Sequence, residues 1–377
     1  MLKLGSIAFG GPAVHVAMLR EETVRRRGWL DDAAFLDLFG AVSVLPGPSS
    51  TQLAIALGRR RAGRAGLLLG GAAFILPAMA LVLALAWAYV RYGATPTGAA
   101  VRYGVAPVVI AVVAVAVVEL ARGALGRRPG RGPAAAAALA ALGLAALAGY
   151  LAGIDVLVIL AVGAAAGGLA GTWRLRPAAR SLLPAVVAVR AGMAALAAAV
   201  QPRRHPGLPA VAGEFLKLGV VVFGSGYALL AFLRRDLTGH GWLSAREVLD
   251  AVVAGQVTPG PVFTTATFLG YLLGGVPGAL VATAAIFAPS FAMVAALEPR
   301  VERLRRSPVA GGALDGVTVA ALGLMAGVTV DLGRAAVGDA LTAAVAVAAL
   351  LVVLRWRPNP LWLVLAGAAI GVAHSLA

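Results

Sequence analysis

The sequence contains no cysteine, and only 13% of its residues are charged. The lack of cysteine excludes disulfide bonds, thiolate catalysis and cysteine-ligated metal sites. No Gly-x-x-x-x-Gly-Lys-Ser/Thr loop is present, which argues against an ATP-driven pump within this chain. The sequence has no haem or flavin motif either, so we expect no cofactor and no enzyme activity.

Apolar residues, in contrast, are abundant. They make up 60% of the 377 residues, and the mean hydropathy is +0.91. Apolar runs long enough to cross ~30 Å of hydrocarbon recur along the chain. The sequence therefore predicts an all-α polytopic membrane protein, with the lipid bilayer as its surroundings.

The basic excess gives a formal net charge of +16. One explanation is a set of arginine-rich cytoplasmic loops, and the other is a positive field that attracts anions. Because the charge is dispersed among short loops, the pattern does not indicate nucleic-acid binding.

One stretch of about 45 residues occurs twice. Each copy has a lysine, a glycine-rich turn, an arginine with an acidic residue, a Gly-Trp-Leu triplet and a Pro-Gly-Pro triplet. The first copy has Lys3, Phe9 to Pro12, Arg20 with Glu22, Gly28 to Leu30 and Pro46 to Pro48; the second has Lys217, Phe223 to Gly226, Arg234 with Asp236, Gly241 to Leu243 and Pro259 to Pro261. These two lysines are the only ones among 32 basic residues.

The duplication covers nearly the whole chain. It predicts a first repeat over 1–173, an Arg- and Pro-rich linker over 174–213 and a second repeat over 214–377. Glycines also match between the repeats, with Gly104 equivalent to Gly316 and small-xxx-small pairs at Gly163/Gly167 and Gly367/Gly371. Such pairs favour close helix packing.

Eleven apolar stretches are long enough to be considered as spans: 2–20, 66–90, 101–121, 133–151, 154–173, 214–233, 246–272, 278–297, 308–330, 340–354 and 360–376. The stretch 33–57 is also apolar but is interrupted at Pro46-Gly47-Pro48. Two prolines this close break a helix, so we expect two half-helices there, either re-entrant or forming one interrupted span.

Loop charge predicts how the repeats are oriented. Arginines crowd the loop 59–64, whereas the equivalent loop 270–277 is uncharged and the next loop, 300–306, is arginine-rich. Because cytoplasmic loops carry the excess of Lys and Arg, equivalent elements should face opposite sides, as inverted-topology repeats with broken helices. Whether 2–20 or 33–57 is re-entrant stays open, as does the side of the N-terminus; the C-terminus is expected outside.

The Phe-Gly-Gly-Pro at 9–12, the Gly-Trp-Leu at 28–30, the Pro-Gly-Pro at 46–48 and the second copy of this block resemble the chromate ion transporter family in its two-domain form. This resemblance implies an inner-membrane chromate efflux protein that confers chromate resistance. Two features depart from the family pattern. The sequence starts almost on the motif lysine, without the usual leader, and Gly224-Ser225-Gly226 replaces Gly10-Gly11-Pro12, which indicates chemically unequal halves.

The residues at the two breaks suit a tetrahedral oxyanion. A half-helix that starts inside the membrane presents unpaired N–H groups and a partial positive charge, and hydroxyl residues follow both breaks. We therefore predict a site between the repeats, near the bilayer midplane. Its predicted residues are Lys3, Gly10, Gly11, Pro46, Gly47, Pro48, Ser49, Ser50, Thr51, Gln52, Lys217, Gly224, Ser225, Gly226, Pro259, Gly260, Pro261, Thr264 and Thr265.

Each of the remaining polar residues has a functional and a structural interpretation. A lysine inside a membrane is costly and so a functional candidate, but a lysine at a helix end can also extend to the interface. Acids and arginines near the breaks could couple or gate transport, or merely anchor helix ends; these are Arg20, Glu22, Asp37, Arg234, Asp236 and Asp250. The four histidines lack repeat partners and metal-ligand spacing, so we interpret them as structural or solvent-facing.

The sequence favours a secondary transporter that exports chromate. Sulfate and other oxyanions share the charge and shape of chromate, so a sulfate transporter or exchanger stays open, as does an anion channel. The coupling ion and the oligomeric state, a homodimer included, also stay open.

Overall fold

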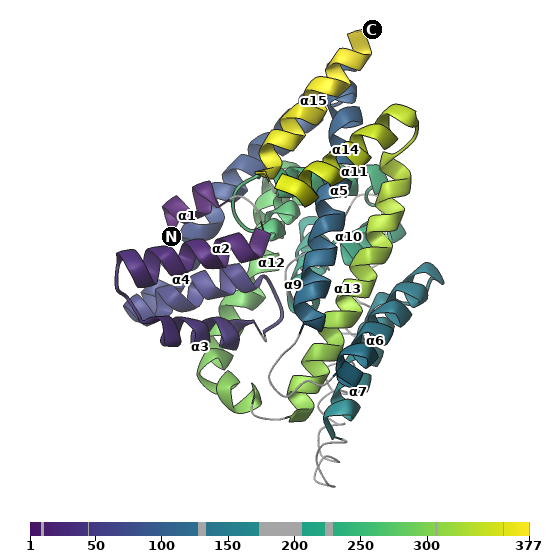
Figure 1. Cartoon of the computed structure of the whole chain (residues 1–377). Helices are drawn as coiled ribbons and strands as arrows, with labels where there is room; N and C mark the ends of the chain where they lie inside the picture. Colours follow the sequence, from purple (N-terminus) through teal and green to yellow (C-terminus); the bar gives the residue numbers. More distant parts are fainter. Residues whose placement is uncertain are drawn as a thin grey trace.

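A computed structural model of the chain describes residues 1–8, 11–43, 45–126, 133–172, 206–222, 229–305, 308–356 and 358–376 (Figure 1). Within these residues the protein is helical and contains no strand. The first half holds α1 (Leu2–Ile7), α2 (Gly11–Arg20), the π-helix η1 (Glu21–Arg26), α3 (Asp32–Val42), α4 (Ser49–Tyr92), α5 (Pro96–Leu125), α6 (Pro133–Leu151) and α7 (Val156–Thr172). The second half holds α9 (Leu208–Val221), α10 (Leu229–Gly239), α11 (Ala245–Val257), the 3-10 helix η3 (Val262–Thr264), α12 (Thr265–Arg305), α13 (Pro308–Ala336), α14 (Ala340–Trp356) and α15 (Pro360–Leu376).

Helices in several parts of the fold are long and apolar enough to cross a membrane. Five qualify by length and composition: Ser49–Tyr92, Pro96–Leu125, Pro133–Leu151, Val262–Ala296 and Gly311–Ala336. Shorter apolar helices lie at Val158–Ala170, Ala340–Trp356 and Pro360–Leu376. The prediction of an all-α, multi-pass membrane protein is confirmed.

Local sequence sets where many helices begin. Proline, which needs no amide hydrogen there, is the first residue of α5, α6, α13 and α15. Asp31 caps α3 by accepting a 2.7 Å hydrogen bond from the Ala34 amide. Ser244 and Glu247 form a capping box at the start of α11. These signals place the short helices α3 and α11 directly before the two Pro-Gly-Pro turns.

The first apolar stretch, 2–20, which the sequence left open as a span or a re-entrant segment, is not one continuous helix. It forms two helices, because α1 ends at Ile7 and Ala8 has a non-helical ψ of 84°. Pro12 lacks an amide hydrogen and is tolerated only in the first turn of a new helix, α2. The stretch 214–233 is likewise divided between α9 and α10. α9 also starts at Leu208, inside the expected linker, and 174–205 lie outside the described residues.

The helix that follows each Pro-Gly-Pro turn folds back on itself. The two arms of α4 meet at Ala62 and Gly63, which have non-helical φ/ψ of −146°/30° and 58°/−137°. The arms touch, since a Cβ on Gly58 would lie 2.2 Å from the carbonyl oxygen of Gly66. α12 makes the same turn at Gly275, with φ 60°. The break expected in 33–57 is therefore present, between α3 and the first arm of α4.

The last helix of each half packs against the other half. α15 lies along α5, and α7 lies along α13 (Figure 1). A Cβ on Gly104 would lie 1.9 Å from the carbonyl oxygen of Gly367, and one on Gly316 would lie 2.0 Å from that of Gly163. The predicted close packing of these glycine faces is confirmed. The two halves are interlocked by this exchange.

Candidate functional site

Each Pro-Gly-Pro turn is held by the end of the first helix of the opposite half. The Gly260 amide donates a 2.9 Å hydrogen bond to the carbonyl of Ala8, where α1 ends. The Gly47 amide donates a 2.6 Å bond to the carbonyl of Val222, where α9 ends. Gly47 (φ 114°) and Gly260 (φ 99°) adopt conformations that other residues rarely take. Both glycines are buried, so the turns lie inside the protein.

The first turn is surrounded by polar side chains. A Cβ on Gly47 would lie 2.7 Å from both Gln52 Nε2 and Ser290 Oγ, and Ser290 comes from α12 of the second half. The Gln52 amide donates to the Pro46 carbonyl. Thr51, Gln52 and Ser290 are completely buried. Within the described part of the chain, Thr51 Oγ1, Gln52 Oε1 and Ser290 Oγ have no hydrogen-bond partner.

His15 also belongs to this environment, although its sequence gave no functional indication. Its ring is 2% exposed, with Nε2 2.9 Å from the Ala8 carbonyl and Nδ1 3.2 Å from Ser50 Oγ. The imidazole thus connects the end of α1 with the first turn of α4. Sequence reasoning also missed Ser290, which follows Pro289, the counterpart of Pro77; a comparison of the two halves could have indicated it.

The second turn has the same backbone but different side chains. Val262 and Phe263 occupy the positions of Ser49 and Ser50. The Thr264 and Thr265 hydroxyls donate to the Pro261 and Val262 carbonyls, at 2.7 and 2.8 Å respectively. Each hydroxyl has one donor hydrogen, and both donor hydrogens are therefore already used within the turn.

Ala78 occupies the position equivalent to Ser290, and a Cβ on Gly260 would lie 2.6 Å from the Ala78 Cβ. The second turn is thus lined by a methyl group where the first is lined by a hydroxyl.

The two lysines differ in their surroundings. Lys3 is exposed on α1. Lys217 is buried on α9, with its Nζ 2.7 Å from Glu214 Oε1 and 2.8 Å from Asp236 Oδ2. Lys217 therefore contacts two carboxylates in this structure. Glu214, at the position three residues before the lysine, was not anticipated.

The predicted coupling residues of the first half form local, exposed contacts. Arg20 Nη2 lies 2.7 Å from Asp32 Oδ1, and Arg27 Nε lies 2.7 Å from Glu22 Oε1. The hydrogen bond from Arg20 holds the pKa of Asp32 below its usual range. Asp37 is exposed. None of these three groups from the prediction, Arg20, Glu22 and Asp37, is brought to the first turn.

Asp250, a predicted coupling residue of the second half, has a side chain that is only 10% exposed. Asp250 accepts a 2.8 Å hydrogen bond from Tyr89 and lies 3.9 Å from Arg102 Nε. These residues line a largely apolar cavity of about 650 Å³ between α4, α5 and α11. The side chain of Arg234, and the residues Gly10, Gly224, Ser225 and Gly226, lie outside what the structure describes; Gly11 is the first residue of α2.

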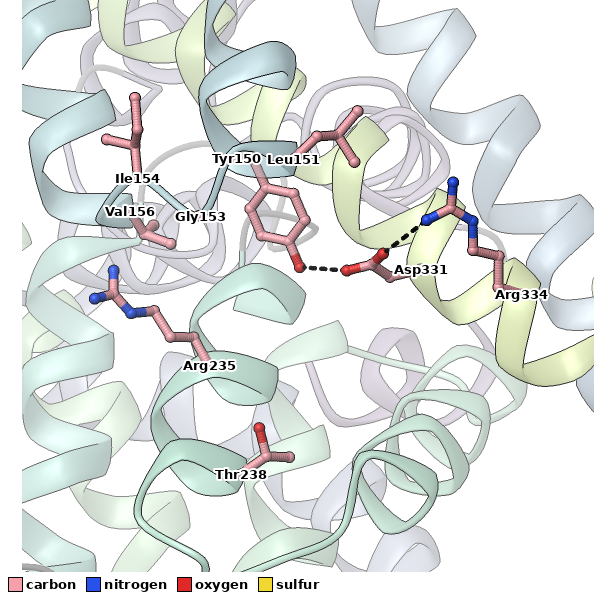
Figure 2. A pocket seen from close by; sticks show the side chains of 9 residues that line it. All are labelled: Tyr150, Leu151, Gly153, Ile154, Val156, Arg235, Thr238, Asp331 and Arg334. Atoms are coloured by element: carbon pink, nitrogen blue, oxygen red, sulfur yellow. Dashed lines mark hydrogen bonds and ion pairs between the residues drawn. The ribbon is translucent and has the colours of Figure 1, made fainter.

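A second cavity, of about 340 Å³, separates the α6–α7 connection from α10 and α13 (Figure 2). Figure 2 shows Tyr150 donating to Asp331, 3.1 Å away, with Arg334 beside it. Arg334 Nη1 lies 3.9 Å from Asp331 Oδ1, one turn earlier on the same helix. Arg235 pairs with Asp155. Arg235 and Arg334, which line this cavity, therefore both have carboxylate partners. The pair of Arg235 with Asp155 joins the two halves beside the cavity.

No metal centre is formed by the described residues. Among them, no group of three or more His, Asp or Glu side chains is placed to hold a metal ion.

Comparison with known proteins identifies the relatives of this chain. The family model described as chromate transporter matches residues 1–169 and 210–372. The chain belongs to the chromate transporter family. The chromate transport protein of Cupriavidus metallidurans is 32% identical over 375 residues, covering 98% of this chain and 90% of that protein. The probable chromate transport protein of Synechococcus elongatus is 33% identical over 377 residues, covering 98% and 92%.

A third relative in this family is the chromate transport protein of Pseudomonas aeruginosa, 34% identical over 341 residues, which covers 88% of this chain and 79% of that protein. No solved structure matches the chain. The duplicated Pro-Gly-Pro turns therefore belong to a chromate transporter with several apolar helices.

Proposed function

We propose that this protein exports chromate across the inner membrane as a secondary transporter, and that the anion binds at the first Pro-Gly-Pro turn. Relatives that are 32–34% identical and named as chromate transport proteins support the substrate. The observation that carries the site is the pair of completely buried hydroxyls without a partner among the described residues, Thr51 Oγ1 and Ser290 Oγ.

Unpaired buried polar groups favour a ligand at this place. Leaving one such group unsatisfied costs about 1–3 kcal/mol, and a bound tetraoxo anion would remove that penalty for Thr51 and Ser290 by accepting hydrogen bonds from their hydroxyls. Gln52 Oε1 is an acceptor and donates nothing to an anion. α4 begins beside them at Ser49, and its N-cap residue, Pro48, supplies no side-chain hydrogen bond. The free N–H groups and the partial positive charge of this helix end favour an anion.

The sequence predicts binding residues at both turns, and the proposal places the anion at the first. At the second turn the Thr264 and Thr265 hydroxyls already donate to backbone carbonyls, and the side chains of Val262 and Phe263 offer no hydrogen bonds. The second turn then acts as the backbone counterpart that positions α1 through the Gly260–Ala8 bond.

The repeat architecture supports alternating access between two inverted halves. The two bonds that join each turn to the opposite half are reciprocal, as are the contacts α7–α13 and α15–α5. The arginine-rich loops 59–64 and 300–306 support opposite orientations of the repeats. In such transporters the substrate lies where the repeats meet, at broken helices.

The membrane potential supplies a driving force in the export direction. A doubly charged anion that leaves a negative-inside cell gains roughly 4–5 kcal/mol per 100 mV, from about 2.3 kcal/mol per charge. Export therefore needs no ATP-binding domain in this chain.

The test is chromate flux into proteoliposomes that contain wild type, Thr51→Val or the matched control Thr264→Val. Thr51→Val removes an unpaired hydroxyl with little change in shape, so we expect unchanged stability and at least a tenfold lower flux. Thr264→Val breaks a hydrogen bond to Pro261, so we expect slightly lower stability and unchanged flux per folded protein.

Three results would contradict this proposal. Equal flux in Thr51→Val and wild type would remove the first turn from the site. Flux that shows no saturation with chromate would indicate a channel. Tighter competition by sulfate than by chromate itself would make sulfate the preferred substrate.

A further inference from the structure

A buried cluster of three ionisable side chains lies between α9 and α10. The Lys217 ammonium is 2.7 Å from Glu214 Oε1 and 2.8 Å from Asp236 Oδ2. The Glu214 side chain is 0% exposed, that of Lys217 10% and that of Asp236 17%. Two carboxylates thus share one ammonium in a site that is nearly closed to water.

The charges of this cluster do not balance. With both carboxylates ionised, the three groups carry one net negative charge, and an uncompensated charge is very costly where water is excluded. Two carboxylates on one cation disfavour double ionisation, and a single proton on one of them makes the cluster neutral.

The neighbouring elements supply no described cation that removes this excess. α12, which packs along α9, has no Asp, Glu, Lys or Arg from Thr265 to Ala296. On the α10 side, His240 follows the helix and Arg235 pairs with Asp155; the Arg234 side chain lies outside the described residues. The proton is therefore the ligand that the chemistry of this cluster selects.

The cluster is mechanically connected to the proposed anion site. Glu214 and Lys217 lie on α9, and the same helix ends at Val222, whose carbonyl accepts the hydrogen bond from Gly47. Val222 lies eight positions after Glu214, about 12 Å along the helix axis. At this range a unit change in charge alters the affinity for a dianion by more than tenfold at a protein-like dielectric.

We propose that Glu214 and Asp236 together bind one exchangeable proton, and that this proton is taken up with the anion and moves with it. One net negative charge then crosses the membrane per chromate, half the charge of the anion alone, and a negative-inside potential still drives it outward. Protonation makes the cluster less negative and so raises the affinity of the adjacent turn for chromate. By linkage, bound chromate raises the affinity for the proton equally. The inference rests on the proposed function, and it names the coupling ion.

The test is the number of protons taken up when chromate binds to the purified protein in detergent. It uses a weakly buffered solution with a pH dye, well above the second dissociation of chromate, so that the anion carries no proton of its own. We expect close to one proton per bound chromate in wild type, and at least a fivefold smaller uptake in Glu214→Gln. Glu21→Gln, which changes an exposed carboxylate remote from the cluster, serves as the control and should keep the wild-type uptake.

The outcomes separate this inference from the proposed function. Chromate binding without proton uptake in wild type would overturn the coupling and leave transport standing, while no chromate binding at all would overturn both. If Glu214→Gln does not fold, Asp236→Asn tests the same cluster, and the wild-type measurement decides independently of either. Full proton uptake in folded Glu214→Gln and Asp236→Asn would remove the cluster from the coupling.

Discussion

The two Pro-Gly-Pro turns have the same backbone and opposite chemistry. Gly47 and Gly260 share a positive φ and a hydrogen bond to the opposite half. Around the first turn, buried polar atoms lack partners among the described residues, whereas the hydroxyls of the second turn are bonded to their own backbone. For the two lysines it is the second half that has the buried polar group, since Lys217 is buried among carboxylates and Lys3 is exposed. The two halves thus share a backbone arrangement and differ in the side chains around it, and our proposals assign anion binding to the first turn and proton binding to the Lys217 cluster.

The largest effect is expected where the halves are alike. Gly104→Val and Gly316→Val each place a side chain against backbone of the opposite half, where even a Cβ would lie 1.9 or 2.0 Å from a carbonyl oxygen. Both should lose stability comparable with that of a whole domain, ~5 kcal/mol or more. Thermal unfolding in detergent measures this. Gly123→Ala on α5, where a Cβ meets nothing within 4 Å, should unfold at or slightly above the wild-type temperature.

The next effect separates the two lysines. Lys217→Met leaves Glu214 and Asp236 buried without their cation, which should destabilise the protein by about 3–5 kcal/mol. Lys3→Met changes an exposed residue and should stay within about 0.5 kcal/mol of wild type. Chemical denaturation of both variants provides the comparison. Equal stabilities would show that the halves do not differ at this position.

A smaller effect is expected from exchanging Ser290 and Ala78, the equivalent residues beside the two turns. Ser290→Ala removes a donor to a charged ligand, worth about 1.5–3 kcal/mol, so the Kd for chromate should rise roughly 10- to 100-fold. Stability should not fall, because Ser290 Oγ has no partner among the described residues. Ala78→Ser should leave the Kd unchanged. An affinity gain in Ala78→Ser would place the anion at the second turn instead.

The smallest effect concerns the exposed pair of Arg20 and Asp32, which the second half lacks because Ala245 occupies the equivalent position. The hydrogen bond from Arg20 lowers the pKa of Asp32 in the folded state from 3.8. This stabilisation is present above the unfolded pKa and is lost as pH falls through the lower, folded value. Asp32→Asn should flatten the acid limb of a stability–pH curve slightly, and an unaltered curve would show that the pair contributes nothing.

The architecture was largely readable from the sequence because it depends on backbone requirements. Pro-Gly-Pro broke the helix where predicted, and the matched glycines predicted close helix packing, although the sequence did not indicate that the partners are α5 with α15 and α7 with α13. The sequence left 2–20 open as a span or a re-entrant segment, because apolar composition does not reveal that the chain leaves the helix at Ala8. The hairpin turn at Gly63 was equally hidden inside an arginine-rich loop.

The site was less predictable because its chemistry comes from tertiary contacts. Ser290 is 243 positions from Gly47 along the chain, and only the fold brings its hydroxyl to that turn. Glu214 is close to Lys217 in sequence, but the excess of negative charge in the cluster depends on Asp236, which only the fold brings from α10 to the lysine. The histidines illustrate the same limit. His15 has no counterpart in the second half, yet it bridges Ala8 and Ser50.

The packing of α7 against α13 and of α15 against α5 also has a consequence for the order in which the helices are synthesised. About 136 residues separate the end of α7 at Thr172 from the start of α13 at Pro308, so the glycine strip of α7 enters the lipid long before its cover is translated. At about 5–20 residues per second, this strip waits on the order of ten seconds. A ribosome that stalls in between leaves an incomplete chain in which the glycine face of α7 is exposed in the bilayer without its partner helix. We expect membrane proteases to degrade such a chain from this exposed helix.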